Sequence, residues 1–123
     1  MTSNDGEIPR AAWQATLEAL TKEHENDVAT VEVAGLDVGD QLEAEQIPFA
    51  YIEYDPHDDA VNVGVGGLDG RYPAVLRHEV AHPQSVFIRS SEVDEPVILT
   101  IEIRSSDEDV TLVSLRPRLE LPA

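Results

Sequence analysis

The sequence contains one stretch whose residue types and spacing match a known metal motif. Residues 78–82 read His-Glu-Val-Ala-His, which is the pattern H-E-x-x-H. On a helix, His78 and His82 would lie one turn apart on the same face and share a Zn²⁺ ion, while Glu79 would take a proton from the metal-bound water. In this interpretation the protein is a small zinc-dependent hydrolase. A downstream carboxylate would be the third ligand, from Glu92, Asp94 or Glu95.

The proline after this motif favours a strand instead. Pro83 cannot continue a helix, because its ring would clash with the carbonyl group of Glu79, and the residue before a proline prefers an extended backbone. In a strand, His78 and His82 would lie about 13 Å apart, too far to share one ion. The secondary structure of residues 74–82 therefore decides whether the zinc hydrolase is possible.

Two further segments have residues that could hold a ligand, but turns explain both better. Residues 55–59, Asp-Pro-His-Asp-Asp, offer carboxylates to a hard cation such as Ca²⁺ or Mg²⁺, yet they lack the spacing of an EF-hand and are typical of a hairpin turn. Residues 64–70 are rich in glycine, without the spacing of a dinucleotide loop or a P-loop. The absence of cysteine excludes thiolate chemistry. We therefore expect no cofactor, with zinc as the alternative.

The charge of the chain restricts its partners and its surroundings. There are 25 acidic and 8 basic residues among 123, a formal charge of −17, and Lys22 is the one lysine. Such a charge disfavours binding to nucleic acid or to an anionic membrane, and no apolar stretch approaches the length of a membrane span. At about 1 M salt the Debye length is roughly 3 Å, so repulsion among carboxylates is screened. We expect a cytoplasmic protein of a halophile.

The elements that must position these residues are one helix and a sheet. From Pro9 to about His24, apolar residues recur at helical spacing as Trp13, Leu17 and Leu20, which predicts a helix with one buried face. The remainder alternates polar and apolar residues between regular turns, as antiparallel strands do. We predict an α+β fold with about seven strands, in a sheet that is either open or closed into a small barrel. The expected strands are residues 28–34, 41–47, 49–54, 61–65, 85–90, 97–103 and 110–116.

Several short motifs occur in the order found in a family of short prokaryotic proteins. They include Ile8-Pro9-Arg10-x-x-Trp13, Val31-Glu32-Val33, Ile47-Pro48, His78 with Pro83, and Ile101-Glu102-Ile103. On these motifs the chain resembles domain of unknown function five-three-three-five, and its acidic composition is that of a haloarchaeal-type member. The resemblance implies an uncharacterised, mostly β domain and supplies no catalytic residues. We expect a disordered tail over residues 1–7, one α+β domain over 8–117 and a C-terminal tail over 118–123.

Large apolar residues lie on both faces of several expected strands. One sheet with one short helix cannot bury both faces, so either the sheet closes or a partner covers it. We therefore predict a non-enzymatic module that binds a protein partner or a second copy of itself. The residues expected at this interface are Phe49, Tyr51, Tyr54 and Phe87.

Overall fold

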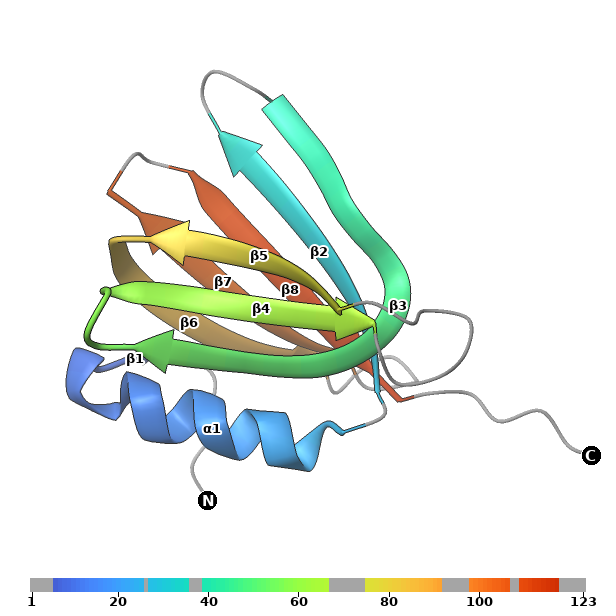
Figure 1. Cartoon of the computed structure of the whole chain (residues 1–123), viewed down its shortest axis with the longest axis horizontal. Coiled ribbons are helices and arrows are strands. Elements are labelled where there is room, and N and C mark those ends of the chain that lie inside the picture. The colour runs from blue at the N-terminus through green and yellow to red at the C-terminus, as the bar shows by residue number, and fades with distance from the viewer. Residues whose placement is uncertain are drawn as a thin grey trace, which may run out of the picture.

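The chain forms one short helix and eight antiparallel strands in the computed structural model, which describes residues 6–25, 27–35, 39–66, 75–91, 98–106 and 109–117 (Figure 1). The strands are hydrogen-bonded in the order β1-β6-β7-β8-β2-β3-β4-β5. The elements are β1 (Gly6–Ile8), the 3₁₀ turn η1 (Arg10–Ala12), α1 (Trp13–Glu23), β2 (Val28–Gly35), β3 (Gly39–Asp55), β4 (Ala60–Gly66), β5 (Val75–Ala81), β6 (Pro83–Ser91), β7 (Ile98–Ser105) and β8 (Val110–Arg116).

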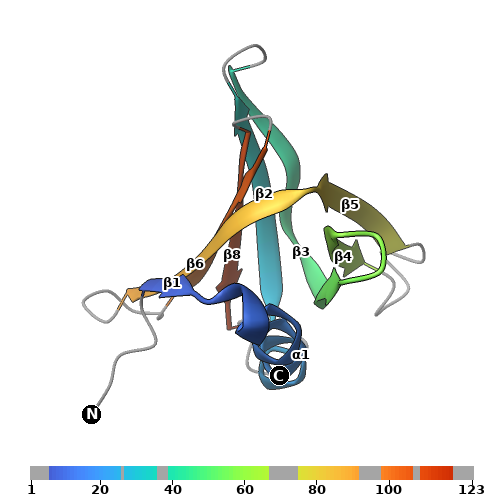
Figure 2. The same cartoon turned by 90° about the vertical axis from the view of Figure 1, so that its left-hand side faces the viewer.

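Strand β3 bends the sheet into two layers. Its first part pairs with β2 and its second part with β4, and the register shifts between Phe49 and Tyr51. The larger layer holds β1, β6, β7, β8, β2 and the start of β3, and the smaller layer holds the end of β3 with β4 and β5 (Figure 2). Pro48 is the last residue of β3 that pairs with β2. Because the hydrogen-bond ladder between β3 and β2 ends at Pro48, the N–H that proline lacks costs this ladder little. The chain therefore continues as one strand where separate strands 41–47 and 49–54 were predicted.

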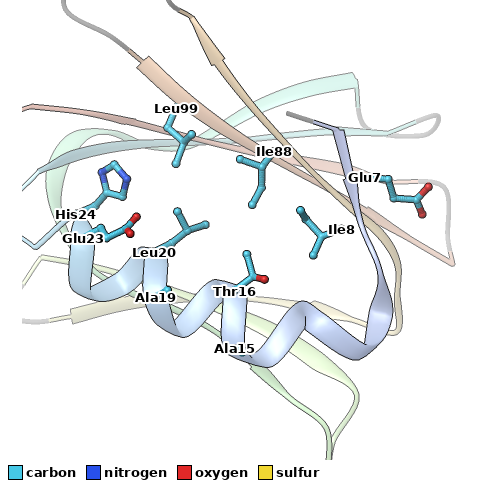
Figure 3. Close-up of a pocket in the computed structure, with 10 residues that line it drawn as sticks. All are labelled: Glu7, Ile8, Ala15, Thr16, Ala19, Leu20, Glu23, His24, Ile88 and Leu99. Carbon is cyan, nitrogen blue, oxygen red and sulfur yellow. The ribbon is translucent and has the colours of Figure 1, made fainter. Parts of the chain in front are cut away.

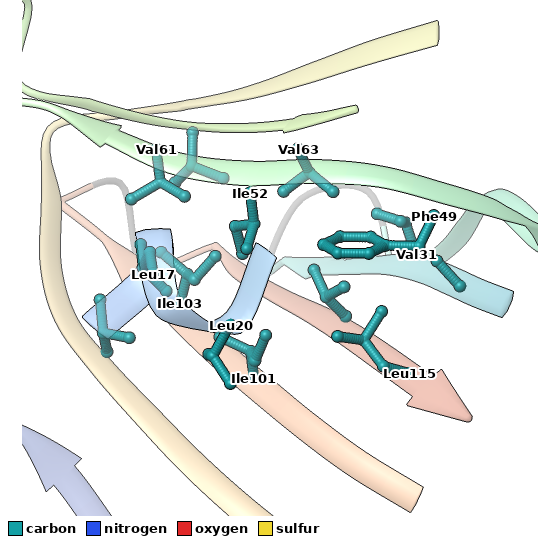
Figure 4. Packing of buried hydrophobic residues seen from close by; sticks show 14 of the residues in the cluster. Leu17, Leu20, Val31, Phe49, Ile52, Val61, Val63, Ile101, Ile103 and Leu115 are labelled. Atoms are coloured by element: carbon teal, nitrogen blue, oxygen red, sulfur yellow. The ribbon is translucent and has the colours of Figure 1, made fainter. Parts of the chain in front are cut away.

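The core lies between the two layers and the helix (Figure 4). Trp13, Leu17 and Leu20 are the buried residues of α1, which confirms the predicted helix face. Inward-facing residues of both layers meet them, because alternate residues of a strand point to the same side. These residues include Val31, Phe49, Ile52, Val61, Val63, Ile101, Ile103 and Leu115.

Helix α1 also completes one edge of β3. The Thr21 hydroxyl accepts a hydrogen bond from the backbone N–H of Ile52 at 3.0 Å and donates one to the Ile52 carbonyl at 2.7 Å. Backbone groups on the edge of a sheet are otherwise available to another strand. The side chain of Thr21 therefore takes the place of a strand neighbour in the second part of β3.

The prediction of an α+β fold with about seven strands is wrong. The fold is mostly β: the predicted strands 41–47 and 49–54 are the single strand β3, and β1 and β5 are additional strands. Gly6 and Glu7, expected in the N-terminal tail, pair with β6. The barrel is also wrong, because β1 and β5 are the two outer strands of an open sheet in the described part of the chain. Since α1 packs its apolar face against the bent sheet, the inner side is buried without closure (Figure 2).

Candidate functional site

The first four residues of the H-E-x-x-H stretch lie on a strand, and His82 follows it. Residues 75–81 form β5 and pair in continuous register with β4, with His78 opposite Val63 and Glu79 opposite Asn62. Glu79 therefore points to the opposite face of the sheet from His78. The helix that the zinc hydrolase requires is not formed. Among the described residues no three metal-binding side chains come together; Glu92, Asp94 and Glu95 lie outside those residues.

His82 forms the corner between β5 and β6. Its φ of 53° is in the left-handed region, and its backbone N–H donates to the Asp59 carbonyl at 2.9 Å. Its own carbonyl accepts from the N–H of Ser106 at 3.1 Å, and its Nδ1 lies 3.4 Å from Oδ2 of Asp59. His82 thus fastens the corner to two neighbouring turns.

Arg10 and Tyr54 join Asp59 and His82 in a network that we call the corner cluster. The Tyr54 hydroxyl donates to Oδ1 of Asp59 at 2.8 Å, and Nη1 of Arg10 lies 3.4 Å from the same oxygen. The Arg10 guanidinium also donates to the Pro83 carbonyl at 3.0 Å. The corner cluster therefore links the N-terminal segment to the β3–β4 turn and to the start of β6.

The carboxylates of residues 55–59 form hydrogen bonds in and beside the turn between β3 and β4. Oδ1 of Asp55 accepts the backbone N–H of His57 at 2.9 Å, as expected for a turn of this composition. Oδ1 of Asp58 lies 3.1 Å from Nδ1 of His57, and Asp59 belongs to the corner cluster. The predicted hairpin turn is confirmed; Asp55 and Asp58 have partners within it, and Asp59 has its partners in the corner cluster.

Removing the Tyr54 hydroxyl should change the titration of Asp59. The hydrogen bond from Tyr54 is the main cause that holds the pKa of Asp59 below its ordinary value of 3.8, with help from His82 and Arg10. Because the folded-state pKa is lowered, the contribution of Asp59 to stability is present above pH 3.8 and is lost as the pH falls through the folded-state pKa. We expect Tyr54→Phe to raise the pKa of Asp59 towards 3.8, as measured by carbon NMR of the carboxyl group.

Tyr51→Phe is the matched control for this titration. Tyr51 lies on the same strand, and its hydroxyl is not part of the corner cluster. The pKa of Asp59 should therefore be unchanged in Tyr51→Phe. Equal titration curves for the two variants would show that the Tyr54 hydrogen bond does not lower the pKa of Asp59.

The four predicted interface residues lie in different environments. Phe49 is 0% exposed and belongs to the core, so it is not on a surface. The Tyr51 ring lies over Gly64 so closely that a Cβ atom at position 64 would collide with it. Glycine is therefore required at this position by the packing of Tyr51. Tyr54 belongs to the corner cluster, and its ring meets Trp13 edge-on at 5.2 Å. Phe87 is partly exposed and lies beside the exposed side chains of Arg89 and Arg104.

Phe87 lies on the outer face of the larger layer between two arginines. Val86 and Ile88 point into the core, so Phe87 and Arg89 point outward. Glu102 lies opposite Phe87 on β7. Its carboxylate accepts hydrogen bonds from Nη1 of Arg89 at 3.1 Å and from Nε of Arg104 at 2.6 Å. Both guanidinium carbons lie near the Phe87 ring centroid, at 5.5 Å for Arg89 and 5.7 Å for Arg104. We call Phe87, Arg89, Glu102 and Arg104 the arginine face.

The arginine face is accessible although its carboxylate is buried. The side chains of Arg89 and Arg104 are 59% and 56% exposed, whereas that of Glu102 is 10% exposed. In the described part of the chain, α1 and the smaller layer lie on the inner side of the sheet, away from this face (Figure 2). The alternation Phe87-x-Arg89 indicates that these two side chains point to one side of their strand, and Glu102-x-Arg104 indicates the same for the other strand. That the two pairs lie side by side depends on the register between the strands, which alternation does not give.

A groove runs between α1 and the strands β1, β6 and β7 (Figure 3). Its volume is about 540 Å³. Ile8, Leu20, Ile88 and Leu99 converge on it, while Glu7 points away from this apolar group (Figure 3). The lining is mixed, because Thr16, Glu23 and His24 add polar groups on the helix side of the groove.

Comparisons with known proteins find a matching family model and a distant relative. A family model described as a family of unknown function (DUF5335) matches residues 4–123. An uncharacterized protein of Aquifex aeolicus (strain VF5) is 25% identical over 115 residues, which cover 94% of this chain and 95% of the relative. No solved structure matches the chain. None of the described residues belongs to a helix with the length and apolarity needed to cross a membrane.

Proposed function

The chain belongs to the family of unknown function DUF5335, and from this premise we propose that it is a non-enzymatic module that binds another protein through its arginine face. The observation that carries the proposal is an aromatic ring held between two half-exposed guanidinium groups on an open sheet face. Aromatic residues and arginines contribute most of the binding energy in many protein interfaces. The arginine face combines both kinds of residue in one place.

The arginines of this face suggest the chemistry of the partner. Two carboxylates, Glu102 on β7 and Glu7 on β1, lie opposite Phe87 and balance the charges of Arg89 and Arg104, so the exposed guanidinium groups rather than a net positive charge distinguish this face. Guanidinium groups bind carboxylates in a planar, two-bond geometry. Glu102 bonds one nitrogen of each arginine and fixes its direction. We infer a protein partner that presents carboxylates beside an apolar group, which would cover the Phe87 ring.

We also propose that the protein works in a cytoplasm at molar salt, as a haloarchaeal-type member of its family would. The support is compositional: the charge is −17 and seven of the eight basic residues are arginines. At about 1 M salt, charges attract one another only over roughly 3 Å. Binding to the arginine face would then depend on direct contact with carboxylates and on burial of the ring rather than on long-range attraction.

Site-specific cross-linking in the native host tests the arginine face. A photoreactive phenylalanine analogue at position 87 should yield a discrete adduct with one protein, which is then purified and titrated against the wild-type chain. Arg89→Gln with Arg104→Gln should weaken that purified complex about tenfold or more, since both carboxylate-binding groups are lost. Glu18→Gln, on the exposed side of α1, should leave the affinity unchanged.

The outcome against the proposal is equally specific. The photoreactive analogue placed at position 18 is the control for cross-linking, and the same adducts from positions 87 and 18 would indicate contacts made at random. An affinity that is insensitive to loss of both arginines would assign the binding to another surface. Circular dichroism of each variant at high salt shows whether it is folded, so that a loss of binding is not confused with unfolding.

A further inference from the structure

Two edges of the bent sheet are protected in the described chain. Strand β1 is an outer strand of only three residues. The second part of β3 is covered by α1, where Thr21 bonds the backbone of Ile52. Short edge strands and edges covered by another element do not readily pair with a second chain.

Strand β5 is an outer strand without these protections. It is seven residues long, and among the described residues β4 is its one strand neighbour. Its register with β4 continues without a bulge from Ala60 opposite Ala81 to Gly66 opposite Val75. It contains no proline and no lysine, and Leu76 is 53% exposed. A long, regular and partly apolar edge is available for pairing with another strand.

The space beside β5 is narrow at the corner end and wider towards Leu76. A groove of about 220 Å³ separates the segment 78–81 from residues of β2, of β8 and of the turn that joins β7 to β8. At the end of β5 next to His82, the N–H of Ser106 in this turn donates a hydrogen bond to the His82 carbonyl. Towards Leu76 the strand is exposed. A second strand would therefore approach from the Leu76 end.

The side chains of β5 are complementary to those of a second, antiparallel β5. Side chains that face each other across two strands must lie on the same side of the sheet, so a two-fold axis must pass through a residue. An axis at His78 places Arg77 opposite Glu79 of the second copy, twice. It also places Leu76 beside Val80 of the second copy, on the inner side. An axis at Arg77 or at Glu79 would instead set like charges against each other.

We propose that two copies of the chain pair through β5 in antiparallel orientation about His78, which joins their sheets into one. The dimer is independent of the arginine face, which lies on the outer side of β6 and β7. The exposed side chains of Arg77 and Glu79 select the register, and Leu76 becomes covered by the second copy.

Charge reversal at positions 77 and 79 tests this pairing. Sedimentation at about 1 M KCl should show a dimer of the wild-type chain that dissociates on dilution. Arg77→Glu alone or Glu79→Arg alone should weaken the dimer about tenfold or more, because each creates two like-charge contacts. The double reversal should restore it. A mixture of the two single variants should form mixed dimers in preference to dimers of either one, as seen by native mass spectrometry with one variant isotopically labelled.

Two further measurements separate this proposal from the preceding one. Arg89→Glu, on the arginine face, should leave the dimer intact, and Arg77→Glu should leave the purified partner complex intact. Backbone amides of β5 should exchange with solvent more slowly in the dimer than in the dilute monomer. A chain that stays monomeric at all concentrations, or a dimer insensitive to every reversal at positions 77 and 79, would overturn the pairing.

Discussion

Replacing Trp13 with alanine is expected to lower the free energy of unfolding by about 3–5 kcal/mol. The ring is 1% exposed, and its Nε1–H donates to the Ile8 carbonyl at 2.8 Å. The Trp13 ring also contacts the Tyr54 ring edge-on, and the Arg10 guanidinium lies over it, 4.3 Å from the Trp13 ring centroid. The substitution removes buried apolar area, leaves a cavity and deprives the Ile8 carbonyl of its partner. The loss is a large part of the stability of an ordinary domain, about 5–15 kcal/mol.

Unfolding in urea at constant KCl measures this effect. Guanidinium chloride is unsuitable, because it is itself a salt and would screen the carboxylates. Gln14→Ala is the matched control, since Gln14 is the next residue of α1 and is exposed; its effect should stay within about 0.5 kcal/mol. If the two variants unfold at the same urea concentration, Trp13 does not anchor the helix to the sheet.

Lowering KCl from about 1 M to about 0.1 M is expected to unfold much of the protein. The Debye length then grows from roughly 3 Å to roughly 10 Å, so that neighbouring carboxylates repel one another. With 25 acidic residues and a formal charge of −17, this repulsion acts over the whole folded surface. Dilution also weakens the burial of apolar groups that excluded salts promote. The midpoint of urea unfolding should therefore fall steadily as KCl is withdrawn.

Sucrose at low salt is the control for this dilution. It is excluded from the protein surface as such salts are, but it does not screen charges. If sucrose restores the urea midpoint in part and KCl restores it fully, the part that sucrose does not restore is due to screening of the carboxylates. An equal midpoint at the two salt concentrations would contradict the proposed adaptation to molar salt.

Local patterns predicted the elements that depend on neighbouring residues. The helix buries Trp13, Leu17 and Leu20 as its spacing indicates, and residues 55–59 form the expected turn. The final hairpin is present as β7 and β8. For residues 74–82 the helical and extended readings both remained open, because a five-residue pattern carries little information. The proline at position 83 indicated the correct one, a strand.

The candidate site was predicted only in part, because strand pairing joins residues far apart in the chain. Phe87 was expected at an interface because large apolar residues lie on both faces of its strand, but its contact with Arg104 requires the register between β6 and β7. Phe49 was expected there for the same reason and lies in the core. Alternation places a residue on one of two faces, and only the packed layers decide which face is inside.

The sequence by itself determined the strongly acidic composition, the helix with its buried face and the tendency of the remainder to form antiparallel strands. These properties follow from composition, periodicity and turn chemistry, which act within a few residues. The tertiary structure alone decided the bend in β3, the eight-strand order, the corner cluster and the free edge of β5. Each of these depends on which distant strands and turns meet, because the core is buried by the whole chain at once and many pairings satisfy the same local pattern.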